Sequence, residues 1–118
     1  MDRINALDFA REWEAAWNRR DTEAVLRHFH EDAVFTSQIA KRIGFSADGV
    51  MNGKDAIRRY WAAGLAQIPE IHFQVTRVFQ GINTLVIVFN SQQGVDHAEV
   101  LIFKDGLVIE GHGNFAAN

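Results

Sequence analysis

Apolar side chains recur at two different spacings along the chain, which separates a helical part from a strand part. Near the N-terminus, Phe9, Trp13 and Trp17 recur at helical spacing with charged residues between them. This pattern predicts an amphipathic helix over residues 5–18. A second helical stripe follows in the segment TEAVLRHFH, and Asp21 directly before it is a natural N-cap. We therefore expect a second helix over residues 22–30.

The middle of the chain alternates between the two patterns. The segment AVFTSQ, residues 33–38, is rich in β-branched and aromatic residues and predicts a first strand. Residues 40–50 have no clear period and contain two glycines, which indicates a loop or a small ribbon. A third helix is expected after Asn52-Gly53, with Pro69 as its stop. Its apolar stripe consists of Ile57, Trp61, Leu65 and Ile68.

The last part of the chain is a series of apolar segments separated by turns. The segments are IHFQVTRVFQ, TLVIVFN, DHAEVLIFK and LVIEGHGNF, and the turns fall at Gly81, SQQG and Asp105-Gly106. An Asp-Gly pair between apolar runs is a strong hairpin signal. The predicted order is α-α-β-α-β-β-β-β. It indicates an α+β fold in which three helices from the N-terminal half pack on one face of a mainly antiparallel sheet.

Composition narrows the possible partners. The chain has 118 residues, a size typical of one domain, so we expect residues 1–118 to form a single unit. A net charge of −3 disfavours binding to nucleic acid. There is no Cys, which excludes thiol chemistry. No signal peptide or membrane span is recognisable, so a cytoplasmic location without membrane contact is the default expectation.

Two phrases, WNRRDTEAVLRHFHEDAVF and NGKDAIRRYW, together with the order of elements, resemble the nuclear transport factor 2-like superfamily, also called SnoaL-like or cystatin-like. The resemblance extends from about Leu7 to Phe115. It implies a cone formed by the curled sheet and three helices, with a largely apolar pocket at one end. It also implies a homodimer through the outer sheet face. Functions on this scaffold range from ketosteroid isomerase and polyketide cyclase to non-catalytic carriers, so the fold does not settle the function.

The resemblance can be tested against the ketosteroid isomerase pattern, which needs a carboxylate base, a tyrosine donor and a protonated carboxyl. Superposing the pattern places Ser37 at the base, Trp13 at the tyrosine and Glu99 at the late-strand acid. Only Glu99 matches. Because a serine hydroxyl has no accessible proton-accepting form near neutral pH, steroid-type isomerisation is disfavoured.

Glu99 and His97 are the strongest catalytic candidates. They lie two residues apart on a predicted strand and therefore project from the same face, together with Leu101. An imidazole and a carboxyl on the inner face of a cone could carry out acid/base chemistry. The alternative is that His97 lies in solvent at the end of the strand and Glu99 makes a structural hydrogen bond.

The expected lining of the pocket is mainly aromatic, with small residues on the last strand. Glycines there would leave space for a ligand. The alternative is that most of the aromatic residues are simply core. The expected pocket residues are Trp13, Trp17, Phe35, Ser37, Tyr60, Trp61, Phe73, Leu101, Gly111, Gly113 and Phe115.

Several charged side chains have two possible placements. The resemblance implies that His112 lies on the outer sheet face, although a shift of one residue would turn it inward. Arg77 could anchor a carboxylate if its face looks inward, or lie on the surface. His28 and His30 are expected to close the second helix. No His or carboxylate spacing typical of a metal site occurs, so we expect no metal and no other cofactor.

Two hypotheses of function follow. The first is a cofactor-free isomerase, dehydratase or cyclase that acts on an apolar small molecule. The second is a non-catalytic ligand-binding or dimerising association domain. In both cases a homodimer is expected, because TLVIVFN and AEVLIF are apolar on both faces.

Overall fold

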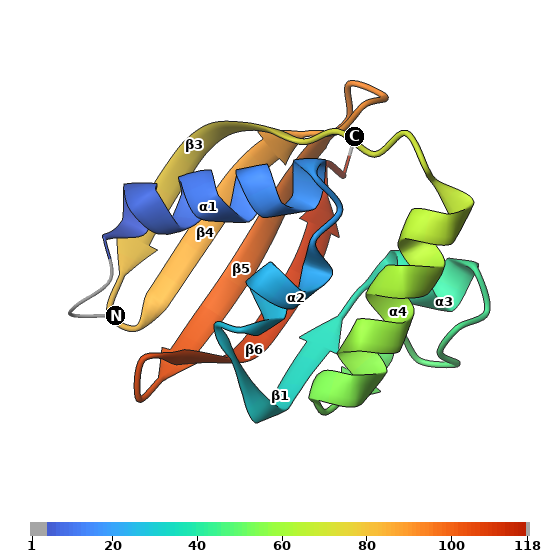
Figure 1. Ribbon diagram of the computed structural model, residues 1–118, viewed down its shortest axis with the longest axis horizontal. Helices are drawn as coiled ribbons and strands as arrows, with labels where there is room; N and C mark the ends of the chain where they lie inside the picture. Colours follow the sequence, from blue (N-terminus) through green and yellow to red (C-terminus); the bar gives the residue numbers. More distant parts are fainter. Residues whose placement is uncertain (1–4, 118) are drawn as a thin grey trace.

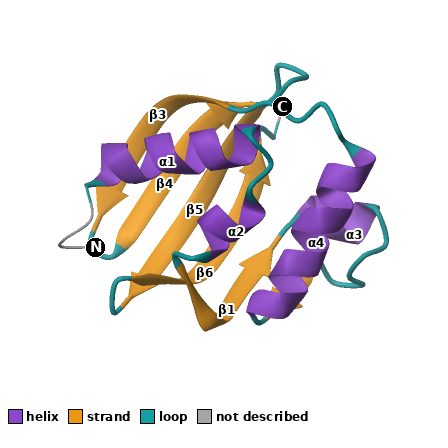
Figure 2. Cartoon of the chain, in the orientation of Figure 1, coloured by secondary structure: helices purple, strands orange, loops and turns teal. Residues whose placement is uncertain are grey.

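The computed structural model describes residues 5–117, which form a six-stranded sheet with four helices on and beside one face (Figures 1 and 2). The helices are α1 (Ala6–Asn18), α2 (Thr22–Leu26), α3 (Gln38–Arg42) and α4 (Lys54–Gln67). The strands are β1 (Phe29–Thr36), β2 (Val50–Asn52), β3 (Gln74–Gly81), β4 (Thr84–Asn90), β5 (Asp96–Lys104) and β6 (Leu107–Phe115). The predicted α+β class is confirmed.

The strands are arranged in the order β2-β1-β6-β5-β4-β3. Every pair is antiparallel except β1 and β6, which run parallel and bring Thr36 opposite His112. The hairpin predicted at Asp105-Gly106 is present, and both residues have positive φ, as a tight two-residue turn requires.

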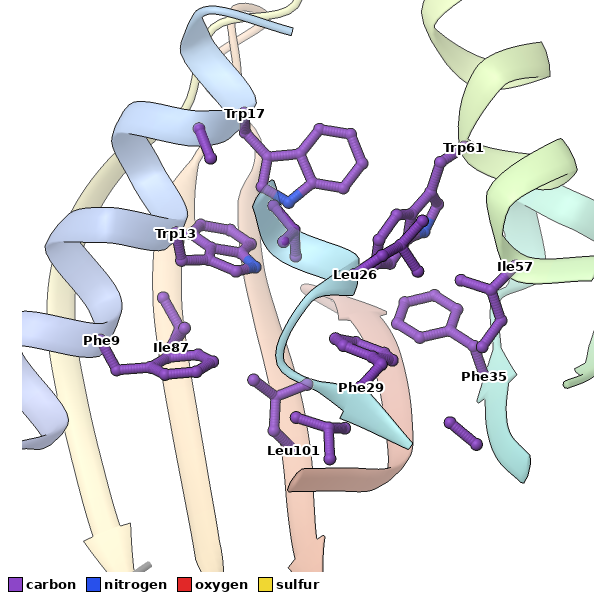
Figure 3. Close-up of a cluster of buried hydrophobic side chains, with 14 of the residues drawn as sticks. Phe9, Trp13, Trp17, Leu26, Phe29, Phe35, Ile57, Trp61, Ile87 and Leu101 are labelled. Atoms are coloured by element: carbon purple, nitrogen blue, oxygen red, sulfur yellow. The ribbon is translucent and has the colours of Figure 1, made fainter. Parts of the chain in front are cut away.

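The helices cover the concave face in two groups. The α1 helix lies across β3 and β4, and α4 lies beside β1, with the short α2 between them (Figure 1). Between the two groups a cluster of apolar side chains fills the interior (Figure 3). Leu26, Ile57, Ile87 and Leu101 in this cluster are completely shielded from solvent. The core therefore holds α1 and α4 apart at a fixed distance above the sheet.

The predicted end of the second helix is wrong. The second helix ends at Leu26, because the chain from Phe29 pairs with β6 and continues as a strand. His28 and His30 therefore do not close this helix. His28 Nε2 lies 3.2 Å from Glu12 Oε1, and His30 is on β1.

The segment after β1 also differs from the prediction. The first strand stops at Thr36, because the Ser37 hydroxyl accepts a hydrogen bond from Ile39 N and begins α3. The predicted loop or ribbon over residues 40–50 contains the end of α3 and the start of β2, and β2 pairs with β1. The third predicted helix corresponds to α4, whose N-cap is Gly53.

Candidate functional site

A cavity of about 180 Å³ lies between the concave face of the sheet, α1 and α4. We call it the aromatic cavity, because eight of its 21 lining residues are Phe, Trp or Tyr. Trp13 and Trp17 come from α1, Tyr60 and Trp61 from α4, and Phe89 from β4. The rings hold one another in place: Trp17 and Trp61 make an edge-to-face contact with centroids 5.0 Å apart. The cavity therefore has a rigid apolar wall.

The remaining lining residues come from the sheet, from α3 and α4, and from the segments that connect these elements. They are Phe35, Ser37, Ile39, Gly64, Leu65, Ile68, Ile71, Phe73, Ser91, Gln92, Gln93, His97, Glu99, Gly113, Asn114 and Phe115.

Glu99 is the acidic side chain of this lining. The alternation of β5 turns Glu99, Leu101 and Phe103 toward the helices, and only 8% of Glu99 is exposed. Its Oε2 atom is buried without a hydrogen-bond partner. Burial raises the pKa of this carboxyl to about 7, although a hydrogen-bonding contact with the Trp13 side chain lowers it. Near neutral pH the carboxyl can therefore either donate or accept a proton.

Two indole N–H groups in the same cavity also lack partners. The Nε1 atoms of Trp13 and Trp17 are buried, and neither makes a hydrogen bond of ordinary geometry. The two residues lie one turn apart on α1, so their side chains share one face of the helix. Figure 3 shows both ring nitrogens directed into the interior rather than toward solvent. The inner part of the cavity thus holds two buried donors beside a carboxyl, and Trp13 is the one that interacts with Glu99.

Ser37 and Tyr60 form a separate polar pair on the α4 side. Their hydroxyl oxygens are 2.8 Å apart, and the Ser37 hydroxyl also accepts from Ile39 N at 3.1 Å. Burial raises the pKa of Tyr60, an effect that the Ser37 hydrogen bond opposes and the charge of Glu99 reinforces. The Tyr60 hydroxyl therefore stays protonated near neutral pH.

His97 lies on the same face of β5 as Glu99 and is partly exposed. Its ring stacks on Phe89 with a centroid distance of 5.0 Å and an angle of 10°. Burial lowers the pKa of His97, while the charge of Asp96 raises it. The imidazole is therefore mainly neutral at pH 7 and can accept a proton.

The mouth of the cavity, where the lining residues are more exposed, also carries polar groups. Ser91, Gln92 and Gln93 in the β4–β5 turn and Asn114 on β6 contribute amide and hydroxyl groups there. Beside the mouth, the guanidinium of Arg42 lies over the ring of Phe115 at 5.4 Å.

Two predicted pocket residues are not in the lining. Leu101 is fully buried in the core, and Gly111 is covered by Phe35. The Phe35 ring approaches so closely that a Cβ on Gly111 would lie 2.7 Å from Phe35 Cδ2. The other nine predicted pocket residues line the cavity, together with Glu99 and His97.

The two ambiguous side chains both face outward. His112 Nδ1 lies 2.7 Å from Thr36 Oγ1, and its Nε2 lies 3.2 Å from Glu110 Oε1. Arg77 is exposed and stacks on Phe79 at 4.7 Å. A register shift between Val75 and Arg77 places Arg77 on the outer face, so it cannot anchor a ligand in the cavity.

The sequence did not indicate that the end of α4 and the β4–β5 turn line the cavity. Leu65 and Ile68 continue the apolar stripe of α4, a signal that could have placed them beside Trp61 on the cavity wall. Gln92 and Gln93 carry no such signal, because their position depends on how the hairpin folds over the sheet.

Two further absences concern the part of the chain that the structure describes. Across residues 5–117, no three His, Asp or Glu side chains gather in a way that could hold a metal ion. None of the described helices is long and apolar enough to cross a membrane.

Comparisons with known proteins place this geometry in a family. Residues 10–111 match the family model of the SnoaL-like domain, so the chain belongs to this family. A SnoaL-like protein of unknown function from Burkholderia thailandensis shares 29% identity with a TM-score of 0.87, over 95% of this chain and 94% of that one. A search of curated proteins gives no match.

More distant solved structures share the fold. AclR, a putative hydroxylase from Streptomyces galilaeus, has 20% identity and a TM-score of 0.72, over 94% of this chain and 88% of that one. TerC, co-crystallised with polyporic acid, has 15% identity and a TM-score of 0.77, over 94% and 91% of the two chains.

Proposed function

We propose that this member of the SnoaL-like family binds an apolar small molecule in the aromatic cavity and carries out cofactor-free acid/base chemistry on it. The observation that carries the proposal is the Glu99 carboxyl, which is buried among rings with Oε2 unpartnered. A carboxyl without a structural partner makes no evident contribution to stability there, whereas a ligand could pair with it. The complex of TerC with polyporic acid supports an organic ligand on this fold.

The chemistry would use two groups from one face of β5. Protonated Glu99 would donate to a substrate oxygen, and neutral His97 would accept a proton from a neighbouring carbon. Return of a proton at a second carbon would complete an isomerisation, and loss of the protonated oxygen as water would complete a dehydration. Ser37 is engaged with Tyr60 and Ile39, so it is better suited to positioning than to proton removal.

The test is a thermal-shift screen with planar apolar compounds, nucleotides and sugars, followed by turnover assays on the compounds that bind. We expect planar apolar compounds to raise the melting temperature and nucleotides and sugars to leave it unchanged. Gly113→Leu should abolish the shift, because Gly113 lines the cavity and a larger side chain there would fill it. A Cβ added at Gly113 would lie 3.9 Å from Glu99 Oε1. Glu110→Leu, on the outer face of the same strand, should retain it. Stabilisation by sugars or nucleotides alone would contradict the proposal.

Glu99→Gln separates catalysis from binding. The amide keeps the shape and a donor but cannot exchange a proton, so we expect binding to persist and turnover to fall by at least about 100-fold. Unchanged turnover between pH 5 and 9 would remove Glu99 from the chemistry and leave a non-catalytic ligand-binding domain, which is the second candidate.

We also propose that two copies of the chain pair through the outer face of the sheet. Val86 lies opposite Val100 on this face, and Val88 lies opposite Ala98. These side chains are only partly buried in one copy. An apolar face of this kind is typical of an interface between subunits.

A further inference from the structure

The structure assigns the inner part of the aromatic cavity to a ligand with one ring and one acceptor oxygen, held by the indole N–H groups of Trp13 and Trp17. This inference rests on the proposed function, since it specifies the ligand of that cavity. It is carried by the two unpartnered donors and by the cavity's size.

The donors define the polar end of the ligand. Buried N–H groups are costly when they lack an acceptor, so a ligand that supplies one is favoured over a ligand that does not. Trp13 and Trp17 are 3% and 7% exposed, and both contribute to the cavity wall. An oxygen placed against them would also lie near the carboxyl of Glu99, because Trp13 and Glu99 interact.

The charge of the lining indicates a neutral oxygen. None of the described residues that line the cavity is Lys or Arg, so no fixed cation is available to neutralise a carboxylate or a phosphate. Arg42 lies outside the lining, over Phe115. A ketone, an aldehyde or a phenol meets these conditions, whereas an organic anion would have to be desolvated without a counter-charge.

The volume limits the ligand to about one ring. A cavity of about 150 Å³ in another protein accommodates benzene, and the aromatic cavity has about 180 Å³. A single ring with a short carbonyl substituent fits this space, and three fused rings exceed it. The polar groups at the mouth would then cover the ligand rather than bind a second ring.

The experiment compares acetophenone with α-methylstyrene, which has the same shape but a CH₂ group in place of the oxygen. Binding is followed by two-dimensional ¹H–¹⁵N NMR of the full chain. We expect acetophenone to bind about tenfold more tightly and to shift the Trp13 and Trp17 indole protons downfield. We expect 9-fluorenone, a three-ring ketone, to bind at least tenfold more weakly than acetophenone.

Variants identify the donors. Trp13→Phe and Trp17→Phe assign the two indole resonances, and each should reduce the preference for acetophenone while α-methylstyrene binds as before. Trp61→Phe is the matched control, because it removes an indole from the α4 side of the cavity. It should change the affinity for both compounds equally. The comparison of ligands on the unmodified chain does not depend on how stable the variants are.

The outcomes separate this inference from the proposed function. Equal binding of the two compounds, a preference for 9-fluorenone, or a shift confined to the Trp61 indole would overturn the assignment but leave an apolar ligand site in place. If no planar apolar compound binds in the cavity, both the assignment and the proposed function are wrong.

Discussion

Glu99 exchanges its proton at a higher pH than an exposed glutamate does, which makes the stability of the fold depend on pH. Its pKa is about 7 in the folded chain and 4.5 in the unfolded one. The folded chain is therefore more stable when Glu99 is protonated. This contribution to the unfolding free energy is fully present below pH 4.5 and is lost as the pH rises through 7, a change of about 3 kcal/mol.

Glu99→Gln removes this titration. Relative to the unmodified chain, the variant should gain about 3 kcal/mol of unfolding free energy between pH 4.5 and pH 8. Urea unfolding of both proteins at several pH values measures the difference. A difference that is independent of pH would show that the carboxyl is solvated in the folded chain.

The Ser37–Tyr60 pair permits a second test, of hydrogen bonding inside the cavity wall. Tyr60→Phe removes one hydroxyl and should cost about 1 kcal/mol. Ser37→Ala should cost about 2 kcal/mol, because it removes both the Tyr60 contact and the cap of α3. A double-mutant cycle by chemical denaturation should give a coupling energy of about 1 kcal/mol. Strictly additive costs would mean that the 2.8 Å contact contributes nothing to stability.

The side chains differ in how well the sequence predicted their positions. That Glu99 and His97 share one face of a strand followed from strand alternation, which is a local property. That this face looks inward was implied only by the resemblance to the family. The outward direction of Arg77 did not follow from alternation, because a shift in pairing with β4 reverses the alternation before it. The hydrogen bond between Ser37 and Tyr60 joins residues from different elements, and no local pattern indicates such a pair.

Strand β6 differs along its length in how closely other side chains approach it. At Gly111 an added Cβ would lie 2.7 Å from Phe35 Cδ2, whereas at Gly113 the nearest atom would be 3.7 Å away. Gly111→Ala should therefore cost about 1–3 kcal/mol, since the Phe35 ring must move in a packed core. Gly113→Ala is the matched control and should change stability by less than about 0.5 kcal/mol. Thermal or urea unfolding of the two variants decides; similar losses would contradict the packing argument.

Element lengths were predicted best where the apolar stripe was long. The helices α1 and α4 were anticipated, and the strands β4, β5 and β6 have the predicted bounds. By contrast, α2 is shorter than its pattern, because pairing with β6 draws Phe29 into a strand. The short α3 and β2 depend on the cap at Ser37 and on pairing with β1, which only the folded chain provides.

The proposed pairing through the outer face of the sheet predicts the mass of the assembly. If two copies pair through this face, light scattering at micromolar concentration should give twice the chain mass of 13.3 kDa. Val100→Glu places a charge in the middle of this face and should yield monomers. Ile82→Glu, at a hairpin position that is 91% exposed, should leave the dimer intact. A monomer mass for the unmodified chain would contradict the proposed pairing.

The parallel contact between β1 and β6 also affects the kinetics of folding. It joins Thr36 and His112, which are 76 positions apart in the chain. On one side of this contact lie β1 and β2 with α4, and on the other side lie β3 to β6 with α1. Closing so long a loop is slow, and the cavity is incomplete until it has closed. A compound bound between Trp61 and Glu99 touches both sides and so resists their separation. In stopped-flow measurements, we therefore expect acetophenone to slow unfolding in proportion to its occupancy and to leave the refolding rate almost unchanged.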